Sequence, residues 1–143
     1  MVYVVRHAEK DLAAADPKDP KLSEQGQRRA AALAQQIDAE ALVAVYATPY
    51  ARTLATAAPS AEAAGRRITE YPADGATRLA ADIRALERGK VLVVGHSNTV
   101  PEILKALGVV EPVELGDGDY GDLFVVTLAA DGNATMERRR FGE

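Results

Sequence analysis

Both histidines of the chain follow directly on short apolar runs. The stretch "VYVVRHAEK" at residues 2–10 passes from an apolar run into Arg6 and His7, and "VLVVGHSNT" at 91–99 passes into His96. Continuous β-branched runs of this length are typical of strands that are buried on both faces of a sheet. Ligands of open α/β sheets bind beyond the carboxyl ends of such strands. If the two strands are neighbours, Arg6, His7 and His96 share one pocket.

A second arginine belongs to the same pattern. Arg52 lies in the first turn of a predicted helix that follows the apolar run at 42–47, with Thr48 as the expected N-cap. Two guanidiniums, two imidazoles and the positive end of a helix together favour an anion. A phosphoryl group fits well, because the planar fork of arginine pairs with two of its oxygens at once. A neutral imidazole can take up that group covalently, while a second, protonated imidazole stabilises the developing charge.

Two other interpretations compete with phosphoryl transfer. Two histidines could hold zinc, but the chain has no cysteine and no carboxylate at a recognisable ligand spacing. Taken one at a time, the histidines could be hydrogen-bonded strand ends and Arg52 a surface residue. The joint pattern favours phosphoryl transfer to a histidine. Because this reaction requires no metal, we expect neither a metal nor a cofactor.

Composition limits the remaining possibilities. The 143 residues suit a single domain over 1–143, and 48% of them are hydrophobic, which is enough for a core. The net charge of −4 gives no electrostatic reason to expect binding to nucleic acid or to an anionic membrane surface. No apolar run approaches the length of about 20 residues that a membrane span needs. The cytoplasm is the default location, although an exported protein shown without its leader would look the same. The oligomeric state stays open.

Apolar runs alternate with helical stretches along the chain. Proline and glycine mark the expected ends: Pro49 suits a first helical position, Pro59 should end or kink its helix, and Gly89 and Gly108 should stop two others. Ser97 is the first choice as cap of the last helix, and Asn98 and Thr99 compete with it. Strands are predicted at 2–5, 42–47, 91–95, 123–128 and 134–141, with a turn at 131–133, and helices at 23–41, 48–58, 77–89 and 97–108. This alternation predicts a three-layer α/β/α sandwich with a mainly parallel central sheet.

Four motifs in this order resemble the histidine phosphatase superfamily, the phosphoglycerate-mutase-like proteins. They are "VVRHAEK", "LSEQGQRRA", "YATPYARTLATAAP" and "GHSNTVPEIL", and the likeness extends over nearly the whole chain. The resemblance implies a phosphoglycerate-mutase-like fold. It places the nucleophile on His7, the phosphate-binding arginines on Arg6 and Arg52, and the second pocket histidine on His96.

The sequence departs from the family pattern at two places. Ala8 stands where the family usually has glycine after the nucleophile, and we expect this extra methyl group to do little harm. The general acid that protonates the leaving oxygen is a carboxylate about two dozen residues after the second arginine in many members. We favour Asp74 for this role, with Glu70 and Glu9 as the other candidates. By default, however, Asp74 is a plain turn residue beside Gly75.

The resulting prediction is a metal-independent phosphatase that hydrolyses a phosphorylated small molecule or a phosphoprotein through a phosphohistidine on His7. The short chain leaves little room for a lid, and an open site favours a phosphatase over a mutase, which must exclude water between its half-reactions. In its short chain and expected open site, the sequence resembles the compact phosphohistidine phosphatases of the superfamily. The alternative is a phosphate-binding or regulatory module of the same fold that no longer turns over.

Overall fold

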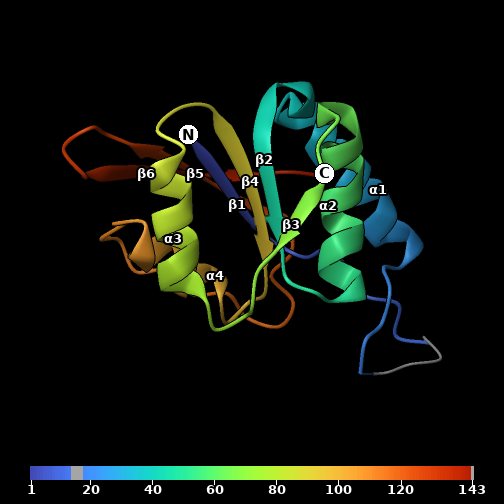
Figure 1. Ribbon diagram of the computed structural model, residues 1–143. Coiled ribbons are helices and arrows are strands. Elements are labelled where there is room, and N and C mark those ends of the chain that lie inside the picture. Colours follow the sequence, from blue (N-terminus) through green and yellow to red (C-terminus); the bar gives the residue numbers. More distant parts are fainter. Residues whose placement is uncertain (14–17, 143) are drawn as a thin grey trace.

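Six strands form one sheet in the order β3-β2-β4-β1-β5-β6 (Figure 1). The computed structural model describes residues 1–13 and 18–142. The strands are β1 (Val2–Arg6), β2 (Leu42–Ala47), β3 (Ile68–Glu70), β4 (Lys90–Gly95), β5 (Asp122–Leu128) and β6 (Ala134–Arg140). The helices are α1 (Glu24–Gln36), α2 (Ala51–Ala64), α3 (Ala76–Ala85) and α4 (Val100–Ala106), with a 3-10 turn, η1, at Ala39–Ala41. No helix in these described ranges is long and apolar enough to cross a lipid bilayer.

The sheet is mainly parallel, as the sequence predicts. Strands β3, β2, β4 and β1 run parallel to one another, whereas β5 is antiparallel to β1 and β6 is antiparallel to β5. The two runs that lead into the histidines are direct neighbours, with Val5 paired to Val94 and Arg6 to Gly95. The carboxyl ends of β1 and β4 therefore stop side by side at the same edge of the sheet.

Helices cover both faces of the sheet, which confirms the three-layer α/β/α architecture (Figure 1). Alternate strand residues face opposite layers because side chains alternate along a strand. Val4 and Val93 pack in the core under α3 and α4, whereas Val5 and Val94 pack in the core under α1 and α2. The continuous apolar runs are explained by this burial on both faces.

The predicted start and end of the second helix are wrong. Helix α2 begins at Ala51 with Tyr50 at the N-cap position, so Pro49 lies outside it and Thr48 is not its cap. The hydroxyl of Thr48 contacts other side chains instead. Pro59 does not end α2, which continues to Ala64 and stops at the left-handed Gly65. The packing of apolar α2 residues on the sheet offsets the one helical hydrogen bond that proline removes.

Three other helices are shorter than predicted. Helix α1 has Ser23 as its N-cap, as expected, with the Ser23 side chain accepting from Gly26 N at 3.1 Å, but it ends at Gln36. Helix α3 ends at Ala85, and the positive φ of Gly89 serves the turn into β4. Helix α4 covers only Val100–Ala106, and Thr99 rather than Ser97 occupies its N-cap position. Gly26 within α1 is explained by close packing, since a Cβ at this position would clash with the carbonyl oxygen of Glu9.

Strand β4 should be the most sensitive part of the core. Leu92 is fully buried between β1 and β2, so Leu92→Ala should lower the free energy of unfolding by about 2 to 5 kcal/mol through lost burial and a cavity. The matched control is Leu12→Ala, because Leu12 is 94% exposed and its truncation should change the free energy by less than about 0.5 kcal/mol. Urea unfolding of both variants measures the difference. Equal effects would contradict this placement of β4.

Candidate active site

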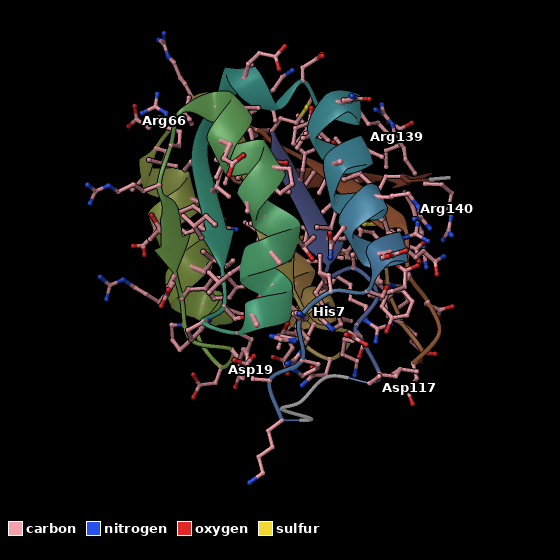
Figure 2. All side chains as sticks on the ribbon, turned by 90° about the vertical axis from the view of Figure 1, so that its right-hand side faces the viewer. His7, Asp19, Arg66, Asp117, Arg139 and Arg140 are labelled. Carbon is pink, nitrogen blue, oxygen red and sulfur yellow. The ribbon has the colours of Figure 1, made fainter. Side chains whose placement is uncertain are left out.

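The two histidines lie next to each other at the carboxyl edge of the sheet. His7 follows β1 and His96 follows β4, and the backbone N–H of His7 donates to Gly95 O at 2.9 Å. The two ring centroids are 5.5 Å apart, with an interplanar angle of 65°. Figure 2 shows His7 at the end of the molecule whose rim also carries Asp19 and Asp117. The parallel pairing of β1 with β4 thus brings together two residues that are far apart in the sequence.

His7 presents a free nitrogen lone pair. Its Nδ1 lies 2.8 Å from the carbonyl oxygen of Ala8, and a carbonyl can only accept, so the ring proton is on Nδ1. Burial lowers the pKa of His7 to about 3, and the positive charges of Arg6 and Arg52 and the His96 ring act in the same direction, while the hydrogen bond to Ala8 opposes them. At neutral pH the imidazole is therefore neutral, with its lone pair on Nε2.

Ala8 fits without distortion at the position where a glycine was expected. Its backbone N–H donates to the hydroxyl of Thr56 at 2.9 Å. Its methyl group is fully buried in a small cluster with Leu22 and Ala30. The structure accommodates the methyl group in this cluster, and its small effect on the site stays a prediction.

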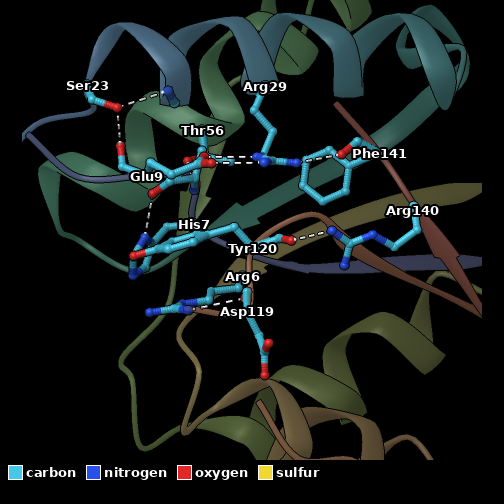
Figure 3. A network of polar contacts seen from close by, with 12 residues as sticks. Arg6, His7, Glu9, Ser23, Arg29, Thr56, Asp119, Tyr120, Arg140 and Phe141 are labelled. Atoms are coloured by element: carbon cyan, nitrogen blue, oxygen red, sulfur yellow. Dashed lines mark hydrogen bonds and ion pairs between the residues drawn. The ribbon is translucent and has the colours of Figure 1, made fainter. Parts of the chain in front are cut away.

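Arg6 is anchored by one end of its guanidinium. Its Nη1 donates to the carbonyl oxygens of Gly116, Asp117 and Asp119 at 3.1, 3.0 and 3.1 Å. The guanidinium carbon lies 4.1 Å from the centre of the Tyr120 ring (Figure 3). Its Nε is buried without a hydrogen-bond partner. The loop between α4 and β5 thus holds Arg6 in place through backbone carbonyls, which do not cancel its positive charge.

The guanidinium of Arg52 makes fewer contacts with the protein than that of Arg6. It is the second residue of α2, and its side chain donates no hydrogen bond to the described residues 1–13 and 18–142. Its guanidinium lies 4.8 Å from the centre of the Tyr50 ring, which in turn meets the His96 ring edge-on at 5.2 Å. Tyr50 therefore links Arg52 to His96. The structure brings all four predicted pocket residues, Arg6, His7, Arg52 and His96, to the same edge of the sheet.

His96 is held from two sides. Its backbone N–H donates to the hydroxyl of Thr99 at 2.8 Å, and its Nε2 lies 2.8 Å from the hydroxyl of Thr48. Burial lowers the pKa of His96 to about 4, with further contributions from the positive charges of Arg52, Arg6 and Lys10. This second histidine is therefore neutral as well at neutral pH.

The three carboxylate candidates lie in different surroundings. Both oxygens of Glu9 accept hydrogen bonds from Arg29, each at 2.9 Å (Figure 3). Burial alone would raise the pKa of Glu9, but the hydrogen bonds from Arg29 outweigh it and the pKa is lowered. Glu9 is therefore an ionised partner of Arg29 and unsuited to donate a proton. Glu70 ends β3, and Asp74 is exposed in the turn before α3. No hydrogen bond among the described residues joins either side chain to His7.

Four functional neighbours were not predicted as such. Tyr120 and Tyr50 support the two arginines, Lys10 adds a positive charge near His96, and Thr48 contacts the His96 ring instead of capping α2. Thr48, Tyr50 and Lys10 had a local signal, since each stands within four residues of Arg52 or His7. In the described part of the chain, no group of three or more His, Asp and Glu side chains is placed to hold a metal ion. The arrangement suits a tetrahedral oxyanion.

Arg52 should contribute directly to oxyanion binding. Arg52→Ala should weaken vanadate binding by about 1.5 to 3 kcal/mol, the typical value for a charged hydrogen-bonding partner. Arg78→Ala is the matched control, because Arg78 is exposed on α3 in a surface pair with Asp82. Inhibition or calorimetric titration measures both affinities. An unchanged vanadate affinity in Arg52→Ala would remove Arg52 from the pocket.

Comparison with known proteins agrees with this geometry. The family model described as histidine phosphatase superfamily (branch 1) matches residues 2–75. The solved structure of the protein histidine phosphatase SixA complexed with tungstate is 21% identical, with a TM-score of 0.78 and coverage of 97% of this chain and 96% of that one. No curated protein sequence matches.

Two further solved structures share the fold. The phosphoserine phosphatase of Entamoeba histolytica in complex with phosphoserine is 18% identical, with a TM-score of 0.67 and coverage of 99% of this chain and 95% of that one. The putative phosphohistidine phosphatase SixA from Agrobacterium tumefaciens is 25% identical, with a TM-score of 0.56 and coverage of 74% and 75%. Since the family model spans more than half of the 143 residues, this chain belongs to the histidine phosphatase superfamily (branch 1) and is an enzyme of the phosphatase class.

Proposed function

We propose that the protein hydrolyses phosphomonoesters or phosphorylated proteins without a metal, through a phosphohistidine on His7. One observation carries this proposal: a neutral, buried imidazole presents its Nε2 lone pair beside two guanidiniums that keep donors unpaired. This combination supplies a nucleophile and a preorganised site for the charge of a phosphoryl group.

The proposed reaction has two steps. In the first, the lone pair of His7 Nε2 forms a bond to phosphorus, and the bond from phosphorus to the leaving oxygen breaks with its electron pair on that oxygen. In the second, water attacks phosphorus and gives up a proton to the carboxylate that protonated the leaving oxygen, or to solvent where no such group acts. The P–N bond breaks with its electron pair on Nε2, and phosphate leaves. Arg6, Arg52 and protonated His96 bind the phosphoryl oxygens in both steps, because these oxygens carry most of the negative charge of the transferring group.

The identity of the general acid narrows the substrate. Asp74 remains our prediction for the group that protonates the leaving oxygen, with Glu70 as the second candidate. If neither acts, a leaving group that needs little protonation is favoured, and the imidazole of a phosphohistidine is one. The resemblance to a protein histidine phosphatase and to a phosphoserine phosphatase supports substrates of both kinds, a phosphoprotein or a small phosphorylated molecule.

A binding module without turnover is the second candidate. The observation in its favour is that Glu9 is tied to Arg29 and that no hydrogen bond of the described chain connects Glu70 or Asp74 to His7.

The short connection between α2 and α3, which contains only β3 and one turn, supports an open site. An open site suits hydrolysis, because water must reach the phosphohistidine.

Hydrolysis of p-nitrophenyl phosphate from about pH 4 to about pH 9 tests the nucleophile. Activity should resist EDTA and be lost in His7→Ala, while that variant should still bind tungstate. On the acid side, the rate constant kcat/KM should fall only as His7 gains a proton, and the lowered pKa of about 3 places this loss below the tested range, so protonation of His7 should not reduce the rate substantially down to about pH 4. Hydrolysis that persists in His7→Ala would show that His7 is not the nucleophile. Tungstate binding without turnover in the parent protein would favour the binding module.

The general acid is tested by comparing leaving groups. If Asp74 protonates the leaving oxygen, Asp74→Asn should slow hydrolysis of a phosphoserine peptide by about 100-fold or more, and hydrolysis of p-nitrophenyl phosphate much less. Glu70→Gln is the matched control at the neighbouring carboxylate. Equal rates of the parent and Asp74→Asn on both substrates would exclude Asp74 from proton transfer.

A further inference from the structure

We propose that Thr48 and Thr53 fix the ring proton of His96 on Nε2, so that binding of a phosphoryl group takes up one proton at His96 Nδ1. Thr53 does not contact substrate in this account and acts through Thr48 as a positioning residue. The inference rests on the proposed function, since it takes His96 as a ligand of the phosphoryl group.

The proton positions follow from a chain of short hydrogen bonds. The Thr53 hydroxyl lies 2.7 Å from Thr48 O and 3.0 Å from Tyr50 O, and both carbonyls can only accept, so Thr53 donates to them. The contact of 2.8 Å between the two hydroxyls must then use the proton of Thr48. The Thr48 oxygen is left as an acceptor for His96 Nε2 at 2.8 Å. His96 therefore carries its proton on Nε2.

The hydrogen bonds that connect Thr53, Thr48 and His96 are shielded from water. Thr48 and Thr53 are both fully buried. The backbone holds the first of them in place, because Tyr50 N donates to Thr48 O at 2.8 Å in the turn between β2 and α2. A buried hydroxyl has no water with which to exchange its partner, so leaving any of these contacts unmade would be costly. Alternative proton positions along the chain are thus disfavoured.

The opposite nitrogen of His96 is left open. Nδ1 has no hydrogen-bond partner among the described residues, and it is not among their buried, unpaired polar atoms. The groups that face the ring are the cations Arg52, Arg6 and Lys10, the neutral ring of His7 and the ring of Tyr50. Burial and these three cations keep the ring neutral, so Nδ1 bears a lone pair.

An oxygen of a dianionic phosphoryl group cannot form a hydrogen bond with the unprotonated Nδ1 of His96. It has no proton to donate, so contact with unprotonated Nδ1 would be repulsive, whereas a protonated Nδ1 would donate a charge-assisted hydrogen bond. The two negative charges of the ligand also offset the three cations that disfavour the imidazolium. Binding therefore takes one proton from solvent, and by linkage the affinity for a dianion should fall about tenfold for each unit of rising pH near neutrality.

The two histidines consequently hold opposite tautomers. His7 has its proton on Nδ1 and its lone pair on Nε2, whereas His96 has its proton on Nε2 and its lone pair on Nδ1. The backbone fixes the first and the threonine pair fixes the second. One imidazole is thus prepared to attack phosphorus and the other to accept a proton when the anion arrives.

Long-range ¹H–¹⁵N NMR spectra of the labelled protein near pH 7 test the tautomers directly. The chain has two histidines, so His7→Ala assigns both sets of signals. In the ligand-free protein His96 should show a protonated Nε2 and an unprotonated Nδ1, and added tungstate should protonate Nδ1. A protonated Nδ1 in the free protein would overturn the proposal, and this result needs neither ligand nor a threonine variant.

Calorimetric titration with tungstate, a dianion at neutral pH, counts the protons. Titrations in buffers of different ionisation enthalpy should give an uptake of about one proton per tungstate bound, in accordance with the linkage relation. Thr53→Val should reduce this uptake markedly, because Thr48 is then free to donate to Nε2 and the ring proton moves to Nδ1. Thr53→Ser keeps the hydroxyl and should match the parent protein.

The outcomes separate the two proposals. Tungstate binding without proton uptake, or an uptake that Thr53→Val leaves unchanged, would overturn the role of the threonine pair while leaving the phosphatase proposal intact. A parent protein that does not bind tungstate at all would contradict the proposed function itself.

Discussion

The parallel pairing of β1 with β4 is the constraint on which the site depends. It places Arg6 opposite Gly95 and ties His7 N to Gly95 O, so that the residues after the two strands become neighbours. A shift of one residue would turn every side chain of one strand to the other face. The valines of β1 and β4 fill both cores, and this packing fixes the register. The stability of the sheet and the geometry of the histidine pair therefore rest on the same contacts.

The second important feature of the site is that no carboxylate in the described part of the chain neutralises its two arginines, Arg6 and Arg52. Among the described residues, neither Arg6 nor Arg52 forms an ion pair, and backbone carbonyls anchor Arg6. Carbonyl dipoles orient a guanidinium without cancelling its charge. The nearby acid, Glu9, is paired with Arg29 instead. The pocket thus keeps its positive potential, holds both imidazoles neutral, and gains most from an anion with two charges.

Local pattern was enough to predict five of the six strands, the layers and the four charged or imidazole residues, whereas the short edge strand β3 was missed. Apolar runs end at His7 and His96, and buried parallel strands are what such runs usually form. The parts that were missed depend on contacts between distant segments. The carbonyls that hold Arg6 come from the α4–β5 loop, and nothing near Tyr120 marks it as a support for Arg6. Thr48 was mistaken for a helix cap because a hydroxyl before Pro49 suits that role, yet tertiary contacts with Thr53 and His96 use it instead.

The proposed reaction depends above all on the transfer of the phosphoryl group to His7. Stopping the reaction with ³²P-labelled p-nitrophenyl phosphate in alkali, and mapping the labelled peptide by mass spectrometry, tests it most directly, because a phosphohistidine is stable in base and labile in acid. We expect one acid-labile phosphoryl group, located on His7. Turnover with a label on another residue, or with no labelled protein at any time before completion, would contradict it.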